Sequence, residues 1–265
     1  MDLELSGKRA IVTGGSKGIG LAIGRALAAE GADVALVARD SATLEAARET
    51  VASQAGGKVI AVAADTGSDA DVRRMVAAVV AGLGGADILV NCAARPNTGA
   101  VYGLDDFDEQ DFNDHLNVKL LGALRTARAV APLMRENGWG RIINISGLAA
   151  RATGSVTGAV RNIAVAAMTK NLADELGKDG INVTVVHPGM TVTERIPGLV
   201  ADRAKALGVS EDEVRRKLDA GTAIGRLVTA EEVADVVAFL ASPKSVGING
   251  DAIPVGGGVP GSVYY

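Results

Sequence analysis

The chain lacks the features that mark membrane-spanning, disulfide-bonded and nucleic-acid-binding proteins. No apolar run approaches the roughly 20 residues needed to cross a bilayer. The single cysteine, Cys92, cannot form an intramolecular disulfide and cannot by itself build a thiolate metal site. The 27 basic and 31 acidic residues leave a formal charge of −4, whereas nucleic-acid phosphates require a basic face. We therefore expect a cytoplasmic protein with no membrane or nucleic-acid partner.

Aromatic residues and histidines are also scarce. Aromatic side chains make up 3% of the 265 residues, and the two histidines, His115 and His187, are too far apart in sequence to suggest metal-ligand spacing. No metal site is expected. Glycine, by contrast, occurs 34 times and 48% of residues are hydrophobic, which is typical of a folded domain with closely packed backbone.

Short apolar segments alternate with helical patterns along the chain. The expected strands are residues 10–13, 33–38, 59–63, 88–91, 141–146, 182–187 and 252–255. The expected helices are residues 20–29, 42–55, 69–83, 112–134, 161–176 and 230–240. Strands that are apolar at nearly every position indicate a parallel sheet buried on both faces. The alternation predicts a single α/β domain over residues 1–265, with a seven-stranded, doubly wound parallel sheet of the Rossmann type.

One segment, residues 194–227, interrupts this alternation late in the chain. It is charged, helical in pattern, and follows the carboxyl end of the sixth expected strand. Ligands of doubly wound sheets bind at the carboxyl ends of the strands. We therefore expect this insertion to form a lid over a small-molecule substrate.

A glycine-rich turn follows the first expected strand and opens the first helix. It reads Thr13-Gly14-Gly15-Ser16-Lys17-Gly18-Ile19-Gly20. Glycines permit a tight turn, and the free N–H groups at the start of a helix bind a pyrophosphate. The placement of this turn between a strand and a helix predicts a dinucleotide site.

The spacing Gly14-x3-Gly18-x-Gly20 resembles that of the short-chain dehydrogenase/reductase family. Further segments along essentially the whole chain resemble the same family: Asn91-Cys92-Ala93-Ala94, Asp65, His187-Pro188-Gly189-Met190-Thr191-Val192-Thr193, and Gly225-Arg226 followed by Glu231-Glu232-Val233-Ala234. The resemblance implies a Rossmann fold and a nicotinamide cofactor. The residues that it implies as cofactor-binding are Gly14, Ser16, Lys17, Gly18, Ile19, Gly20, Arg39, Asp65, Asn91, Ala93, Pro188, Gly189, Thr191 and Thr193.

The resemblance also bears on which nicotinamide cofactor is bound. Relatives that bind NAD carry an acidic residue at the end of the second strand, where it accepts hydrogen bonds from the ribose 2′-hydroxyl. Here Ala38 occupies that position, Arg39 follows it, and Lys17 lies in the glycine turn. Two cations without an acid favour a 2′-phosphate, so NADP(H) is predicted over NAD(H). The alternative is that both cations are solvated surface residues.

The family's catalytic motif is incomplete in this chain. The resemblance implies a Ser and a Tyr that hold the substrate oxygen, a Lys four residues after the Tyr, and an Asn on the preceding helix, because the alkoxide made by hydride transfer needs acid–base help. Ser146 is the candidate serine, although the family's usual position one residue later is Gly147 here.

The Tyr and Lys positions hold neither residue. Aligning the following helix on residues 164–170 places Gly158 at the Tyr position and Asn162 at the Lys position. A slipped register places Thr157 and Arg161 there instead. In both registers the Tyr-x3-Lys pair is absent.

The Asn position of the fourth helix holds Lys119, so Lys and Asn have exchanged places between two groups that lie close together in the family. We expect Lys119 to replace the missing lysine from the opposite helix, beside Asn162. A partly desolvated lysine has a pKa closer to neutrality and is able to donate a proton. The alternative is that Lys119 is an exposed helix cation and Asn162 an ordinary residue near a helix start.

Three tyrosines remain as replacements for the missing acid. Tyr102 follows the fourth strand, near the start of the family's substrate pocket, and is the leading candidate. Tyr264 and Tyr265 end the chain and would act across a subunit interface. His115 precedes Lys119 by one helical turn, but we expect it to lie at a helix surface or an interface. We expect a structural role for His187.

These observations favour an NADP(H)-dependent oxidoreductase that interconverts a carbonyl and a hydroxyl group with an atypical catalytic set: Ser146, Lys119, Asn162 and Tyr102. The alternative is a redox-inactive NADP(H)-binding sensor or scaffold, since the cofactor end is intact and the catalytic end is rewritten. The apolar fourth and fifth helices imply, by analogy with the family, a homotetramer, with a dimer as the alternative.

Overall fold

Seven parallel strands form one sheet in the order β3-β2-β1-β4-β5-β6-β9. The computed structural model describes residues 1–95 and 103–261. The strands are β1 (Arg9–Thr13), β2 (Asp33–Ala38), β3 (Val59–Ala63), β4 (Ile88–Asn91), β5 (Gly140–Ile145), β6 (Ile181–Pro188) and β9 (Ala252–Val255). The order confirms the expected seven-stranded, doubly wound sheet. The strands are all parallel, and the order in which the chain adds them reverses between β1 and β4.

The strands are apolar because helices cover both faces of the sheet. All residues of β4, β5 and β6 are buried. Val90 in β4 lies between Val12 of β1 and Ile143 of β5, so the central strands present a continuous row of branched side chains. Branched residues pack well on a pleated surface, and their lack of polar atoms suits a layer without water.

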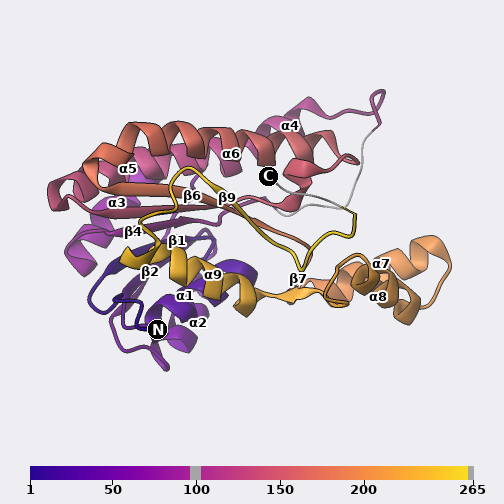
Figure 1. The fold of residues 1–265 in the computed structure, drawn as a ribbon, viewed down its shortest axis with the longest axis horizontal. Coiled ribbons are helices and arrows are strands. Elements are labelled where there is room, and N and C mark those ends of the chain that lie inside the picture. The colour runs from indigo at the N-terminus through magenta and orange to yellow at the C-terminus, as the bar shows by residue number, and fades with distance from the viewer. Residues whose placement is uncertain (96–102, 262–265) are drawn as a thin grey trace.

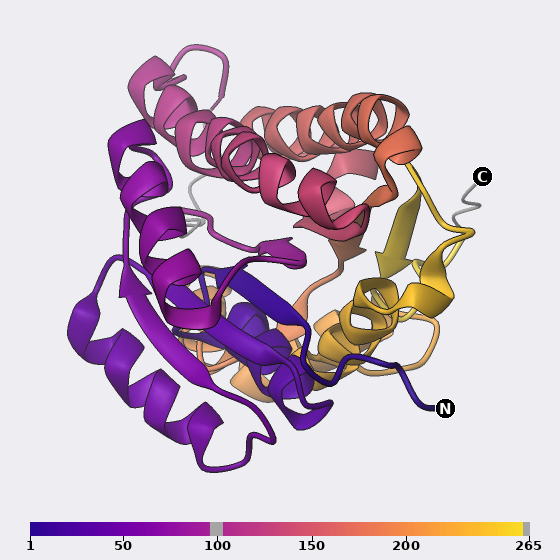
Figure 2. The same ribbon diagram turned by 90° about the vertical axis from the view of Figure 1, so that its left-hand side faces the viewer.

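Two layers of helices enclose the sheet, as Figures 1 and 2 show. The helices are α1 (Gly18–Ala29), α2 (Ser41–Ala52), α3 (Asp69–Leu83), α4 (Glu109–Leu116), α5 (Gly122–Asn137), α6 (Val156–Leu176), α7 (Ile196–Leu207), α8 (Glu211–Ala220) and α9 (Ala230–Ala241). Ile23 of α1 and Val237 of α9 belong to the apolar core on one face. Met75 of α3, Val130 of α5 and Leu176 of α6 belong to the core on the other.

The expected fourth helix, residues 112–134, is interrupted, so the prediction of one continuous helix is wrong. A π-helical turn, η1 (Asn117–Leu121), separates α4 from α5. The guanidinium of Arg125 donates to the Asn117 carbonyl at 3.2 Å and to Asn117 Oδ1 at 2.8 Å. This side chain therefore hydrogen-bonds both the backbone and the side chain of the first residue of the π turn. π turns inside helices often occur at functional sites, and this one carries Lys119.

Helix α6 begins at Val156, five residues before the expected start at residue 161. The side chain of Ser155 accepts a hydrogen bond from the Gly158 N–H at 3.0 Å and caps the helix. The glycine at position 158 obscured the pattern, since glycine is a poor helix former. The extra turn places Arg161 and Asn162 inside the helix rather than at its start.

The insertion of residues 194–227 is helical, and it projects away from the sheet and the helices that cover it. Helices α7 and α8 project from one end of the sheet in Figure 1. They share a small core of their own, which includes Ile196, Val200 and Val214. Short strands β7 (Thr191–Val192) and β8 (Val228–Thr229) pair at the base of the insertion and tie its two ends together. This two-stranded sheet had no recognisable signal in the sequence.

No helix in the ranges 1–95 and 103–261 is both long enough and apolar enough to cross a membrane.

Candidate active site

The glycine-rich turn forms a close cradle at the carboxyl end of β1. Gly14 and Gly18 have positive φ angles of 68° and 53°, which other residues rarely adopt. A Cβ atom on Gly20 would lie 2.3 Å from the Gly14 carbonyl oxygen, so the first turn of α1 contacts the turn backbone directly. Ser16 and Ile19 stand beside these glycines, in the turn and in the first turn of α1. The turn leads directly into α1, whose N-cap Lys17 makes no side-chain cap hydrogen bond, and the free N–H groups of such a helix start suit a pyrophosphate.

A hydroxyl group ties this cradle to the next strand. Thr13 Oγ1 accepts hydrogen bonds from the backbone N–H groups of Cys92 at 3.1 Å and Ala93 at 3.2 Å. A Cβ atom on Gly14 would lie 3.0 Å from Ala93 Cα, so the two segments are in contact. The predicted cofactor residues Gly14 and Ala93, which are far apart in sequence, therefore lie side by side.

The segment after β6 reaches the same cradle. Pro188 ends β6, and Thr191 Oγ1 donates to the Gly189 carbonyl at 3.0 Å. A Cβ atom on Gly18 would lie 3.4 Å from Thr193 Cγ2. The structure thus brings Thr193 to the glycine turn, and Pro188, Gly189 and Thr191 precede it in the same segment.

The residues predicted at the adenosine end lie beyond β2 and β3. Arg39 follows β2 directly and is exposed, as is Lys17 in the glycine turn. Asp65 follows β3, and its Oδ1 accepts from the Gly67 N–H at 2.8 Å. Asp40 caps α2 through the Thr43 N–H, and the hydrogen bonds from Thr43, helped by the charge of Lys17, lower the pKa of this carboxyl group.

A chain of buried amides and hydroxyls braces the ends of β4 and β5. Asn91 Nδ2 donates to Asn144 Oδ1 at 2.9 Å, and Asn144 Nδ2 donates to Thr169 Oγ1 at 2.9 Å. Thr126 Oγ1 donates to Asn91 Oδ1 at 2.7 Å. The Asn91 side chain, predicted to bind cofactor, therefore makes hydrogen bonds to other protein side chains. No sequence pattern singles out Asn144, Thr126 or Thr169 as functional residues, because the hydrogen bonds between them join residues on different elements.

Lys119 reaches from the π-helical turn to the end of β5. Its Nζ donates a hydrogen bond to the Ser146 carbonyl oxygen at 2.9 Å. The side chain as a whole is partly exposed, but burial of the amine, together with the charge of Arg161, lowers the pKa of Lys119 to about 7. An amine with that pKa both gives and takes a proton near neutral pH.

Asn162 meets the same serine from the opposite helix. Ser146 Oγ donates to the Asn162 carbonyl at 2.9 Å, so Lys119 and Asn162 both contact Ser146. The Asn162 amide lies beside Gly147, within 3.2 Å of where a Cβ atom would be. Its Oδ1 is buried and has no hydrogen-bond partner among the described residues. A buried, unpaired acceptor at this place fits a hydroxyl group of a bound ligand.

His115 is buried, with 4% of its surface exposed, so the expectation of a surface or interface position is wrong. Its Nδ1 lies 2.6 Å from Arg161 Nη1 and accepts that proton, since a guanidinium only donates. Its Nε2 lies 3.6 Å from Asp111 Oδ2. Burial and the charge of Arg161 lower the pKa of His115, which keeps the imidazole neutral at pH 7.

Arg161 is the functional candidate that sequence reasoning passed over, having named it only for a slipped register. The sequence contained one signal: Arg161, Val165 and Thr169 follow at four-residue spacing along a helix, and such spacing puts them on one buried face. Burying a cation costs free energy unless the charge is paired or hydrogen-bonded.

The remaining candidates are His187 and three tyrosines. His187 Nδ1 accepts from the Gly147 N–H at 3.4 Å, and burial, followed by the charge of Arg151, lowers its pKa to about 4. Tyr102, Tyr264 and Tyr265 lie outside the described residues. Within the described part of the chain, no three His, Cys, Asp or Glu side chains are grouped in a way that would hold a metal ion.

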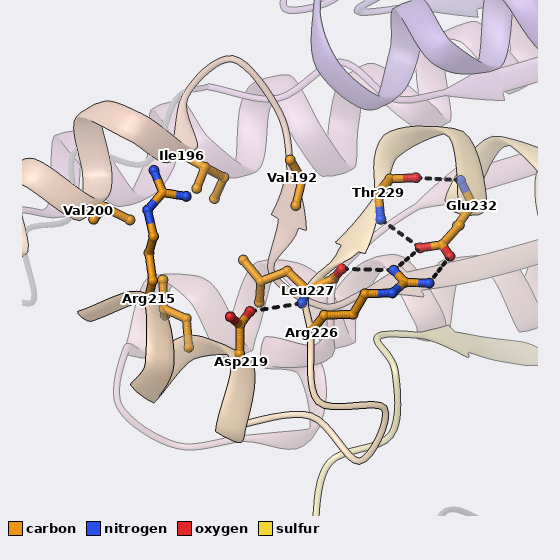
Figure 3. Close-up of a pocket in the computed structure, with 10 residues that line it drawn as sticks. Val192, Ile196, Val200, Arg215, Asp219, Arg226, Leu227, Thr229 and Glu232 are labelled. Atoms are coloured by element: carbon orange, nitrogen blue, oxygen red, sulfur yellow. Dashed lines mark hydrogen bonds and ion pairs between the residues drawn. The ribbon is translucent and has the colours of Figure 1, made fainter. Parts of the chain in front are cut away.

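A separate cavity of about 390 Å³ lies at the base of the insertion, between α7, α8 and the β7–β8 pair (Figure 3). Its lining is largely apolar, with Val192, Ile196 and Val200 on one side. Arg226 donates to both carboxylate oxygens of Glu232, which lowers the pKa of that carboxyl group to about 2. Arg226 and Glu232 neutralise each other, and their ion pair joins the end of the insertion to the start of α9.

Comparisons with known proteins cover nearly the full length of this arrangement. The family model described as enoyl-(acyl carrier protein) reductase matches residues 14–260. The short-chain reductase protein NovJ of Streptomyces niveus is 37% identical over 95% of this chain and 93% of its own. The D-beta-hydroxybutyrate dehydrogenase of Rhizobium meliloti is 32% identical over 95% of this chain and 98% of its own.

The chain belongs to the short-chain dehydrogenase/reductase family. Among solved structures, the L-sorbose reductase from Gluconobacter frateurii, complexed with NADPH and L-sorbose, matches with a TM-score of 0.92 and 32% identity, covering 99% of this chain and 100% of that one. An NAD⁺-bound xylitol dehydrogenase matches with a TM-score of 0.88 and 28% identity, covering 96% and 100%. The protein is therefore an oxidoreductase of this family.

The residues present fit a nicotinamide cofactor of the family. The cradle around Gly14 and Gly20 has no room for side chains, which leaves backbone N–H groups to meet a pyrophosphate. The buried Asn162 Oδ1 has no hydrogen-bond partner among the described residues, and an acceptor of this kind suits a hydroxyl group. Helix α6 contains no tyrosine, so the family's usual proton donor is not offered from that helix.

We expect Gly20→Ala to raise the Kd for the reduced nicotinamide cofactor by about tenfold or more, a loss of at least ~1.4 kcal/mol. The added methyl group would lie 2.3 Å from the Gly14 carbonyl oxygen and force the cradle apart. Fluorescence titration of the bound nicotinamide measures the change. Gly198→Ala, where an added methyl group meets nothing within 4 Å, is the control. Equal Kd values for both variants would contradict the assignment of the cradle.

Proposed function

We propose that the protein interconverts a carbonyl and a hydroxyl group of a small molecule by hydride transfer with NADP(H), using Lys119 in place of the family's Tyr and Lys. The observation that carries this proposal is the desolvated amine of Lys119, 2.9 Å from the Ser146 carbonyl oxygen. Burial and the charge of Arg161 bring the pKa of Lys119 to about 7, where a proton donor works at neutral pH.

When bound, the cofactor supplies the hydride in reduction and accepts it in oxidation. Lys119 then holds the substrate oxygen and gives it the proton that balances the new negative charge. Ser146 Oγ, now bonded to the Asn162 carbonyl, turns its proton toward the same oxygen. Asn162 Oδ1 accepts from the ribose and keeps the nicotinamide in place. The insertion of residues 194–227 covers the substrate, and Tyr102 stays a candidate second donor.

The pH dependence and a single substitution test this role of Lys119. Reduction needs the protonated amine, so its rate should fall as pH rises through about 7, while oxidation should rise over the same range. Lys119→Met should lower kcat/KM by about 10²–10⁴-fold and remove this pH dependence. Stopped-flow measurement of NADPH consumption gives both results, with cofactor Kd measured in parallel.

Lys119→Arg is the matched variant for charge, since its guanidinium keeps the cation but does not titrate near neutral pH. It should retain cofactor affinity but lose the activity change near pH 7. Full activity of Lys119→Met would contradict the proposal that Lys119 and Asn162 have exchanged roles.

A second candidate function is a redox-inactive NADP(H)-binding sensor or scaffold. The observation that favours it is the complete cofactor cradle next to a helix α6 without tyrosine. Firm NADPH binding with no turnover of any member of a panel of aldehydes, ketones and quinones would favour this function. Turnover of any panel member would exclude it.

The preference for NADP(H) over NAD(H) rests on Arg39, which is exposed at the end of β2, and on Lys17 in the adjacent turn. Arg39→Glu should raise the Kd for NADPH by about 10–100-fold and leave NADH binding intact or improved, because a charged hydrogen bond to phosphate is worth ~1.5–3 kcal/mol. Arg216→Glu makes the same charge change on exposed α8 and should alter neither Kd. Equal losses for both cofactors would contradict a 2′-phosphate contact.

The oligomeric state is proposed to be a homotetramer, with a dimer as the alternative. Large apolar side chains are exposed on α5 and α6, including Leu124 and Ile163, which is 56% exposed. Sedimentation velocity should give a tetramer for the native protein and smaller species for Ile163→Glu. Leu207→Glu, on the exposed surface of α7, should leave the assembly intact. A monomeric native protein would contradict the proposal.

The single domain over residues 1–265 and a reducing, cytoplasmic location stay parts of this proposal. The burial of Cys92, which raises the pKa of its thiol to about 11, is in keeping with a cysteine that stays reduced.

A further inference from the structure

Arg161 is a buried cation that no described carboxylate pairs with directly, although the charge of Asp111 acts on it from beyond ion-pair distance. Only 9% of its surface is exposed, and its Nε is buried with no hydrogen-bond partner among the described residues. Its one hydrogen bond within that part of the chain is to His115 Nδ1, at 2.6 Å. The imidazole is neutral, so this contact orients the guanidinium without cancelling its charge.

The nearby carboxylates make their direct contacts with other side chains, and Asp111 acts on Arg161 only at longer range. Asp111 and Asp114 both face Arg95, with Asp111 Oδ1 at 3.8 Å from its Nη1 and Asp114 closer. Asp111 also lies 3.6 Å from His115 Nε2. No described carboxylate lies within ion-pair distance of Arg161 or Lys119, and the segment 96–102 contains neither Asp nor Glu.

Two cations therefore converge on the substrate end of the site. Arg161 precedes Asn162, which meets Ser146, and its charge reaches Lys119 strongly enough to lower the pKa of that amine. Desolvating a guanidinium costs several kcal/mol unless an anion pairs with it. An edge of a guanidinium binds a carboxylate through two parallel hydrogen bonds.

We propose that Arg161 binds a carboxylate group of the substrate, so that the preferred substrates are carbonyl compounds that carry an acid group near the reacting carbon. This inference rests on the proposed oxidoreductase function and names its substrate class. The carboxylate pairs with Arg161, which His115 holds in place, while the carbonyl oxygen lies at Lys119. The substrate supplies the direct ion-pair partner that no described carboxylate provides.

Pairs of 3-oxo acids and their methyl esters test the proposal, because each pair shares one reacting carbonyl and differs only in charge. At pH 6, where Lys119 is mostly protonated, the native protein should reduce each acid with a kcat/KM about 10–100-fold above its ester. Arg161→Gln should raise KM for the acids by the same factor and leave the esters and the NADPH Kd unchanged. The acid-to-ester ratio should fall to about one.

Two matched variants separate charge from structure. Lys170→Gln removes a positive charge from the exposed surface of the same helix and should keep the native ratio. Arg161→Lys keeps the charge without the planar fork and should retain part of the preference, which also answers any failure of Arg161→Gln to fold. An equal loss for acids and esters in Arg161→Gln, or a native ratio near one, would overturn the proposal.

A binding measurement distinguishes failure of this proposal from failure of the proposed function. If no acid or ester is turned over, calorimetry of benzoate with the NADPH-saturated protein decides the carboxylate site alone. Tight binding that weakens about 10–100-fold in Arg161→Gln would support the site in a redox-inactive protein. Equal benzoate affinities in both proteins would reject it, whatever the catalytic result.

Discussion

The structure depends on one constraint: a parallel sheet that is buried on both faces ends all its strands at the same edge. Every polar group that leaves β1, β4, β5 and β6 therefore meets the others there. Thr13 joins two of these ends by accepting the Cys92 and Ala93 N–H groups. Pairing in the sheet keeps these strands side by side. The glycine turn, the segment after β6 and the Ser146 region therefore lie at the same edge of the sheet.

That same burial determines the electrostatics of the site. The amine of Lys119 is desolvated, and the nearby guanidinium of Arg161 disfavours its protonated form further. A family that places Tyr and Lys on one helix has its acid and its cation next to each other in sequence. In this chain the cation comes from the π-helical turn, and Asn162 comes from α6. The Lys119 amine and the Asn162 backbone carbonyl both contact Ser146.

The difficulties of prediction lay where side chains overrode the local pattern. The strands were predicted to within about one residue, because their apolar runs follow directly from burial on two faces. The π turn at Asn117 was not predicted, because residues 112–134 follow an α-helical pattern throughout and the Arg125–Asn117 contact is not visible in that pattern. His115 was placed at the surface, because periodicity alone does not reveal that Arg161 of another helix covers it.

The sequence by itself determined the sheet, the glycine cradle and the departure from the Tyr-x3-Lys motif, since each is a matter of residue type at fixed spacing along the chain. Only the tertiary structure decided that Lys119 points to Ser146, that the Asn91 amide is taken up internally, and that Arg161 is buried beside His115 without a carboxylate partner in the described chain. These are relations between side chains on different elements. Their energies depend on distance and desolvation, which become defined only when the helices pack on the sheet.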